Sequence, residues 1–164
     1  MPRQNTKLES EGAEFLVLGQ LLTNGIPSYK AYTNMAGYDI VATNPDRNTS
    51  ARIQVKSRWR TGAEGFIIKG FDCDFVVVVL LNRGSKDGKA KVLPPEFYVL
   101  PVKAVESLDD PSNKWGKLTL SKIEGFRQQR DNWESIREFL HQAPIPFIEK
   151  TITGKPVSAP HINR

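Results

Sequence analysis

The run FVVVVLLN at residues 75–82 constrains the fold more than any other stretch of the sequence. It is rich in β-branched side chains and stays apolar until its last residue, a pattern typical of a strand buried on both faces at the centre of a sheet. Such a strand needs other elements to cover both of its faces. The chain of 164 residues has the length of one ordinary domain and buries enough surface to fold without disulfide or metal cross-links.

Other elements follow from periodicity and turn signals on either side of this run. An amphipathic helix is predicted from residue 6 to about residue 24, ended by Gly25. Its apolar stripe consists of Leu8, Phe15, Leu18 and Leu22, widened by Val17 and Leu21. Short strands are predicted at 28–33, 65–69 and 96–101, a short helix at 102–108, and either a strand or a loop at 115–120. Asp131 and Glu134 fit a capping box that opens a helix through Leu140.

This order of elements predicts a mixed α/β domain with a central sheet, spanning residues 1–145. Residues 146–164 are expected to form a flexible tail, because this stretch is poor in apolar residues and contains prolines. The longest apolar run is too short to span a membrane, and the polar start lacks the apolar core of a signal peptide. A cytoplasmic location is therefore expected.

Composition narrows the classes of function. Cys73 is the only cysteine, which excludes an intrachain disulfide and a four-cysteine zinc site. A glycine-rich phosphate loop of the Walker type is absent, so an ATP-driven motor is not expected. The net charge of +5 favours a polyanionic partner, because bound cations release counterions from a phosphate backbone.

Polar residues fall in a specific pattern in the stretch GYDIVATNPDRNTSARIQVKS at residues 37–57, which predicts a β-hairpin with its turn in NPDRN. If Asp39 pairs opposite Gln54, then Tyr38, Ile40 and Ala42 share one face with Ala51, Ile53 and Val55. Asp39 then shares the other face with Arg52, Gln54 and Lys56. A slip by two residues keeps these faces and still leaves Asp39 beside Lys56, so both registers gather a carboxylate, an amide and an ammonium group.

The simplest interpretation of this gathering is a hairpin with one solvated face and a cross-strand ion pair. Two features argue against it. The run at 75–82 requires cover on both faces of the sheet, so a wholly open face is not expected. A further acidic candidate lies on the first helix, where Glu11 and Glu14 both fall on or near the apolar stripe. An acid in that position is unusual unless it has a partner.

The same residues resemble the PD-(D/E)XK, or restriction-endonuclease-like, nuclease superfamily. The helix reads GAEFLVLGQLLTNG, the first hairpin strand GYDIVA and the second IQVKS, and the resemblance covers residues 11–57 and reaches about residue 82. It implies that Glu14 is the helix acid, Asp39 the motif aspartate, Gln54 the variant of the second acid and Lys56 the motif lysine. The fold implied is a restriction-endonuclease-like core with a central mixed β-sheet flanked by α-helices.

The resemblance also implies a cofactor, Mg²⁺ or Mn²⁺, held by Asp39, Gln54 and Glu14, with Lys56 serving the transition state. Tyr38 replaces the proline of the motif, which leaves the chemistry unaffected. Gln54 replaces an acid, and its amide oxygen coordinates a hard cation without adding charge, so a weaker metal affinity is expected.

Beyond the lysine, the residues Ser57, Arg58, Trp59 and Arg60 suit a nucleic-acid groove, with cations on phosphates and the ring on a base. A loop whose tryptophan covers the core is an equally ordinary interpretation. Arg52 shares the face of Gln54 and Lys56 and is a further candidate for phosphate binding, against the alternative of an exposed strand arginine.

The sequence thus predicts a divalent-metal-dependent nuclease that hydrolyses phosphodiester bonds in DNA, with endonuclease action favoured over exonuclease action. Its partner would be DNA, and a homodimer would suit cleavage of both strands. One alternative is a non-catalytic nucleic-acid-binding module that keeps the nuclease fold with a weakened metal site, and Gln54 keeps this alternative open. The other is a protein-interaction domain with an incidental basic surface.

Overall fold

The computed structural model describes residues 5–32 and 37–142. The expected tail at 146–164 and most of the turn expected at 34–37 lie outside the described residues. Within the described part, no helix has the length and apolar character needed to cross a membrane.

A five-stranded sheet forms the centre of the fold, in the strand order β1-β2-β3-β5-β6. The strands are β1 (Ser28–Lys30), β2 (Ile40–Asn44), β3 (Thr49–Arg58), β5 (Phe75–Leu80) and β6 (Glu96–Pro101). β3 and β5 are parallel, whereas the other neighbours are antiparallel, so the sheet is mixed. β5 is the expected central strand: it lies between β3 and β6, and all six of its residues are buried.

The hairpin of β2 and β3 has the first of the two predicted registers. Ile40 pairs with Ile53 and Asn44 with Thr49, which puts Asp39 opposite Gln54. One part of the prediction is wrong: Tyr38 precedes β2 and packs against the hydrophobic cluster on the opposite face of the sheet from Ile40. Residue 38 lies outside the paired strand, so the strict alternation of side chains does not hold it to that face.

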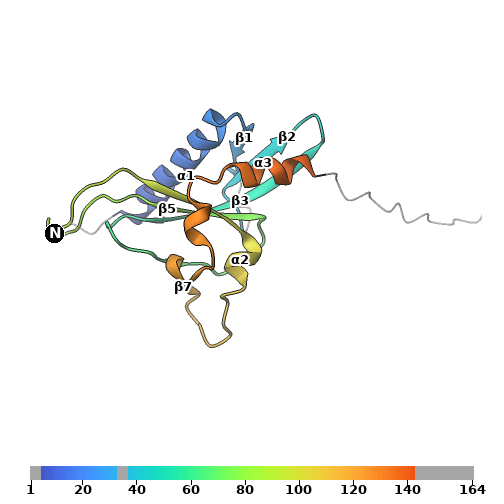
Figure 1. Ribbon diagram of the computed structural model, residues 1–164. Helices are drawn as coiled ribbons and strands as arrows, with labels where there is room; N and C mark the ends of the chain where they lie inside the picture. The colour runs from blue at the N-terminus through green and yellow to red at the C-terminus, as the bar shows by residue number, and fades with distance from the viewer. Residues whose placement is uncertain (1–4, 33–36, 143–164) are drawn as a thin grey trace, which may run out of the picture.

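The two faces of the sheet carry separate hydrophobic clusters because successive residues of β5 point to opposite sides. Phe75, Val77 and Val79 join the cluster covered by α1 (Thr6–Thr23) and α3 (Glu134–His141). Val76, Val78 and Leu80 join the cluster on the other face. Figure 1 shows α1 and α3 above the sheet and the smaller elements below it. Those elements are β4 (Gly65–Ile67), α2 (Val102–Glu106), β7 (Lys117–Thr119), η1 (Leu120–Lys122) and η2 (Phe126–Gln129).

Helix α1 has the predicted length, and its predicted stripe is confirmed in part: Val17 and Leu21 are buried and Leu18 packs against the core. The side chain of Asn5 caps its first turn, and Gly25, with φ of +72°, ends it in the left-handed region. Its buried residues are Ala13, Val17 and Leu21, whereas Leu8, Phe15 and Leu22 are exposed. Both sets have helical spacing.

Helix α3 confirms the predicted helix but not the capping box. Its first turn has no side-chain cap, and Asp131 adopts φ of +52° while donating its backbone N–H to Phe97 O at 2.9 Å. Asp131 therefore turns the chain onto β6 instead of capping the helix.

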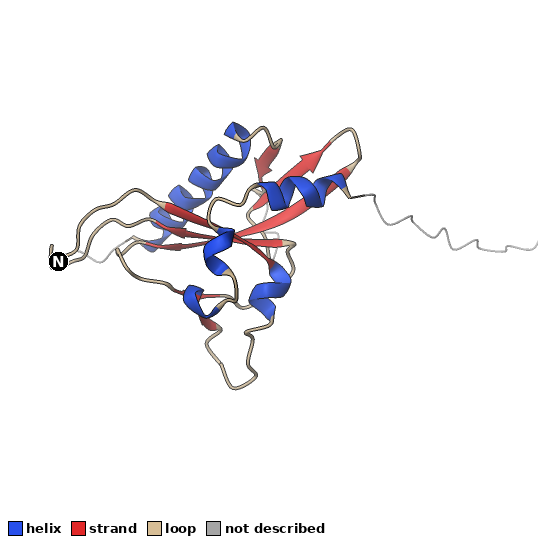
Figure 2. Cartoon of the chain, viewed as in Figure 1, coloured by secondary structure: helices blue, strands red, loops and turns tan. Residues whose placement is uncertain are grey.

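The connection between β5 and β6, residues 81–95, is the long tan loop that extends beyond the ends of the strands in Figure 2. Arg83 and Val92 form an isolated antiparallel bridge within it. The buried side chain of Asn82 donates to Pro94 O at 3.0 Å. These contacts hold the two arms of the loop together.

Candidate active site

The candidate site lies at an open edge of β3. β2 pairs with β3 only up to Ile53, whereas β3 continues to Arg58 with β5 along its other edge. Residues 54–58 therefore have no β2 backbone beside them. Helix α1 and the residue that precedes β2 approach this uncovered edge.

Asp39 takes the place of the missing strand at that edge. Its backbone N–H donates to Ile53 O at 2.9 Å, and its carboxylate oxygen Oδ2 accepts the backbone N–H of Val55 at 2.7 Å. A hydrogen bond to an ionised acceptor is shorter and stronger than a neutral one, so this contact fixes the carboxylate. Gly37 sets up the approach, because a Cβ there would lie 2.9 Å from the carbonyl oxygen of Asp72.

Gln54 lies opposite Asp39 in the register, and its side-chain oxygen has no hydrogen-bond partner. Oε1 of Gln54 is buried, and among the described residues nothing donates to it. An unsatisfied buried acceptor costs about 1–3 kcal/mol. Such an atom in a folded protein calls for an explanation, and a bound cation or water is one that supplies the missing partner.

Lys56 lies two residues further along the same face of β3 and is half-buried. Burial lowers the pKa of its ammonium group, against the opposing charges of Asp39 and Cys73. Within residues 5–32 and 37–142, the ammonium group makes no hydrogen bond and no ion pair. It lies at a cavity of about 380 Å³ that is also lined by Thr6 of α1 and Phe66 of β4.

Glu14 approaches the same edge from α1 and is mostly buried. Burial raises the pKa of its carboxyl group, the hydrogen bond from Lys30 lowers it, and the charge of Asp39 raises it further. The electrostatic effect of Asp39 shows that the two carboxylates belong to one local environment. The structure thus brings all four residues of the resemblance to one edge: Glu14, Asp39, Gln54 and Lys56.

Lys30 is the member of this environment that the sequence analysis missed. It is only 7% exposed, and its Nζ forms ion pairs with both Glu11 and Glu14. The ring of Phe15 lies below the same ammonium group, at 4.5 Å from Nζ to the ring centroid. The available signal was the pair of acids near the apolar stripe of the helix, which required a partner. Lys30 is that partner.

The donor set suits a hard divalent cation. Glu14 and Asp39 supply carboxylate oxygens, and Gln54 supplies the unsatisfied amide oxygen. Such cations prefer oxygen ligands. Among the described residues, no group of three or more His, Cys, Asp or Glu side chains could hold a metal ion, so a cation here would need the amide oxygen of Gln54 as a ligand.

The basic candidates have different environments. Arg52 is held by acidic partners: its guanidinium pairs with Asp72 and Asp74, and its backbone N–H donates to Asp74 at 2.7 Å. Phosphate binding by Arg52 therefore stays a prediction that competes with these ion pairs. The residues that follow Lys56 line the cavity beside it: Ser57, Arg58, Trp59 and Arg60.

Comparison with protein-family models and with curated proteins gives no match. Solved structures do match, among them that of a bacterial homing endonuclease, I-Ssp6803I. The two chains are 21% identical and superpose with a TM-score of 0.58, over 84% of this chain and 94% of the other. The fold is therefore shared with an endonuclease, which confirms the predicted α/β class with a central mixed sheet flanked by helices.

Proposed function

We propose that the protein is a divalent-metal-dependent nuclease that hydrolyses phosphodiester bonds in DNA, with endonuclease action favoured. The observation that carries the proposal is the unsatisfied Oε1 of Gln54, buried opposite Asp39 and two residues from Lys56. The fold shared with a homing endonuclease supports the same conclusion. The arrangement also agrees with the resemblance of these residues to the PD-(D/E)XK superfamily.

Asp39, Gln54 and Glu14 are the residues that would hold the cation, Mg²⁺ or Mn²⁺. Once bound, the metal would polarise the phosphate and acidify a coordinated water. Asp39 is suited to this role because the N–H of Val55 fixes its carboxylate before any ligand arrives. Preorganised groups stabilise a transition state without having to reorganise when charge develops.

Lys56 would act on the phosphate or on the attacking water. Its ammonium group is half-buried and carries no hydrogen bond within the described chain, so its donors are available to a substrate oxygen. An ammonium group with a lowered pKa also transfers a proton more readily near neutral pH. Either role places a positive charge where negative charge grows.

The test is cleavage of supercoiled plasmid, linear duplex, single-stranded DNA and RNA with Mg²⁺, Mn²⁺ or a chelator. The variants are Asp39→Ala and Lys56→Ala, and Lys103→Ala on α2 is the control, because Lys103 is exposed and far from the site in sequence. Metal-dependent nicking of the circular plasmid that is lost in the two site variants and kept in the control supports an endonuclease. Cleavage that proceeds equally in a chelator would contradict the proposal.

Gln54 favours a second candidate, a nucleic-acid-binding module without catalysis. Because an amide contributes no charge, a site with two carboxylates binds a divalent cation more weakly than a site with three. This candidate predicts salt-sensitive DNA binding, no cleavage and no metal uptake by calorimetry.

A further inference from the structure

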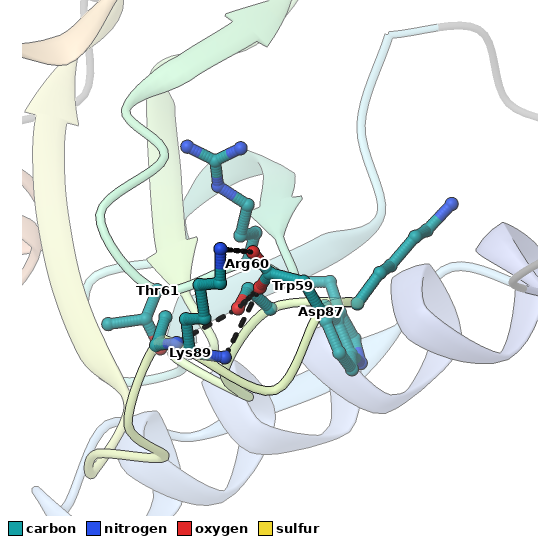
Figure 3. A pocket seen from close by; sticks show the side chains of 8 residues that line it. Trp59, Arg60, Thr61, Asp87 and Lys89 are labelled. Atoms are coloured by element: carbon teal, nitrogen blue, oxygen red, sulfur yellow. Dashed lines mark hydrogen bonds and ion pairs between the residues drawn. The ribbon is translucent and has the colours of Figure 1, made fainter.

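Two cavities adjoin along the end of β3. The first, about 380 Å³ in volume, contains Lys56. The second, about 680 Å³, lies between the end of β3 and the loop that joins β5 to β6. Trp59 and Arg60 line both of them, so a hollow surface leads from the candidate catalytic lysine to that loop. Figure 3 shows side chains that line the second cavity, with Trp59, Arg60, Thr61, Asp87 and Lys89 labelled.

The loop is fastened to the end of β3 by Thr61. The backbone N–H of Thr61 donates to Gly84 O at 2.9 Å, and its hydroxyl accepts the N–H of Gly84 at 2.9 Å. The same hydroxyl donates to Lys91 O at 2.7 Å. One threonine therefore holds both arms of the loop against β3, which fixes the walls of the second cavity relative to Lys56.

The tip of the loop has internal order as well. The hydroxyl of Ser85 donates to Asp87 and accepts the N–H of Ala90 at 2.9 Å. The N–H of Lys89 donates to the Asp87 carboxylate at 3.2 Å, and the N–H of Gly88 to Ser85 O at 3.0 Å. These bonds define a tight turn and occupy the carboxylate of Asp87 within the loop.

The charge of this region is strongly positive. The nine-residue segment RGSKDGKAK at 83–91 carries one acid, Asp87, and four basic residues. Of these, Lys86 and Lys89 line the second cavity together with Arg60. All three of these side chains belong to exposed residues, and only Lys89 has an ion pair within the described chain, at 3.9 Å from Asp87.

We infer that the second cavity, called the cleft below, binds the sugar-phosphate backbone of the substrate DNA beside the bond that is cut. Arg60, Lys86 and Lys89 would contact the phosphates. The inference rests on the proposed function, because it assumes that the DNA that is cut passes through the first cavity, beside Lys56. The cleft offers ammonium, guanidinium and hydroxyl donors, and donors of these kinds make the phosphate contacts that position a protein on DNA without reading its sequence. The side chains of Ser85 and Thr61 add the hydroxyl groups.

The spacing of Lys56 and Arg60 along the chain is short enough for both residues to contact one DNA duplex. Arg60 lies four positions after Lys56, and an extended chain spans at most about 14 Å over that length. With a rise of about 3.4 Å per nucleotide of one strand, the cleft would lie within about four base pairs of a phosphate bound at Lys56.

The test is the salt dependence of DNA binding in a chelator, where cleavage does not interfere. The probe is a fluorescein-labelled duplex of mixed sequence, measured by fluorescence anisotropy at several salt concentrations. The cleft variant is Lys86→Ala with Lys89→Ala. The matched control, Lys103→Ala with Lys114→Ala, removes the same charge at two exposed residues. Lys103 lies on α2, at the opposite end of β6 from the loop, as Figure 1 shows.

The cleft variant is expected to weaken binding about tenfold and to reduce the salt slope by about two, one for each phosphate that the variant no longer neutralises. The control is expected to change affinity less than about twofold, since it alters only the long-range field. Equal effects of both variants, or no effect of the cleft variant, would overturn the inference.

Failure of the proposed function has a different signature. A wild-type protein that does not cleave DNA, while the cleft variant still loses affinity and slope, would refute the nuclease and keep the cleft. A protein that cleaves with Mg²⁺ while the cleft variant binds and cleaves as the wild type does would keep the nuclease and refute the cleft. Both variants change only exposed side chains, and thermal unfolding verifies that their folds are equal.

Discussion

The ammonium group of Lys30 lies 2.9 Å from a carboxylate oxygen of Glu14. Lys30 is almost fully buried at the end of an edge strand, and Glu11 completes its pairing from the same helix. The pair joins α1 to β1 beside the candidate active site. It also balances negative charge where Glu14 and Asp39 repel each other.

Replacing Lys30 by methionine is expected to destabilise the protein. The change keeps the length of the side chain but leaves Glu14 in a mostly buried position without a cation, and a buried charge without its partner is costly. The carboxylate of Glu11 is half-exposed and can be solvated once Lys30 is gone, so only Glu14 is left as a buried charge without a partner. A decrease of about 2 kcal/mol in the free energy of unfolding is therefore expected. Urea denaturation measures it, with Lys103→Met as the control. An unchanged free energy would show that the ion pairs carry no net stability.

Replacing Glu14 by glutamine is expected to keep the fold and abolish cleavage. Burial raises the pKa of Glu14 above its ordinary value of 4.5, so the folded protein binds its proton more tightly than the unfolded chain does. Stability therefore falls as pH rises from about 4.5 through the raised pKa, and this step should be missing in Glu14→Gln. Urea denaturation across that pH range tests the sign. Glu106→Gln, at an exposed position of α2, should retain the step.

Replacing Gln54 by glutamate should lower the stability of the metal-free protein and raise its affinity for Mg²⁺. A new buried carboxylate opposite Asp39 adds like-charge repulsion. Without metal, the free energy of unfolding should therefore fall by about 1–3 kcal/mol, and the melting temperature should fall with it. Mg²⁺ should then raise the melting temperature more than in the wild type, because tighter ligand binding stabilises the folded state further. Gln128→Glu adds the same charge at an exposed position and should show neither effect. An identical Mg²⁺ shift in Gln54→Glu and wild type would contradict the metal site.

Replacing Lys56 by methionine should remove activity and increase stability. Burial lowers the pKa of Lys56, so the folded state disfavours the charged form, and the unfolded chain binds the proton more tightly. Wild-type stability should therefore rise with pH between the lowered pKa and 10.5, whereas the variant lacks this rise. At neutral pH the variant is expected to gain about 1 kcal/mol in the free energy of unfolding while cleavage is abolished. A decrease in stability would instead indicate that Lys56 supports the fold.

The thiol of Cys73 is expected to be inert in the folded protein. It is 3% exposed, and burial, with the charge of Asp74, raises its pKa to about 11. Because the thiolate is the reactive form, alkylation by iodoacetamide at neutral pH should be slow in buffer and fast in urea. Mass spectrometry of the labelled protein measures both rates. Rapid labelling of the folded protein would show that this face of the sheet opens.

Much of the fold follows from local patterns in the sequence. The β-branched run at 75–80 forms the central strand because only a sheet covered on both faces accepts such a run. The alternation in IQVKS excludes a slip of the hairpin by one residue, since such a slip would move every apolar side chain to the wrong face, but it leaves two registers open. That alternation places Gln54 and Lys56 on one face, whereas the hydrogen bonds of Asp39 to Ile53 O and from Val55 N–H hold its carboxylate at the same edge.

The face that α1 buries does not follow from its sequence. The predicted stripe is wide, and of its members Val17 and Leu21 are buried together with Ala13, whereas Leu8, Phe15 and Leu22 are exposed. The packing of α1 against the sheet decides which of these side chains are buried, and one element alone does not specify that packing.

Local sequence is thus enough to specify the central strand and to exclude hairpin registers that mix the two faces, because strand alternation acts over a few neighbouring residues. The structure decided between the two remaining registers and aligned Asp39 with Gln54. Tertiary packing was needed to show that Lys30 neutralises Glu11 and Glu14, and that the loop at 81–95 meets the end of β3 at Thr61. These contacts join segments far apart in the chain, and their partners are set by how the helix and the loop pack against the sheet.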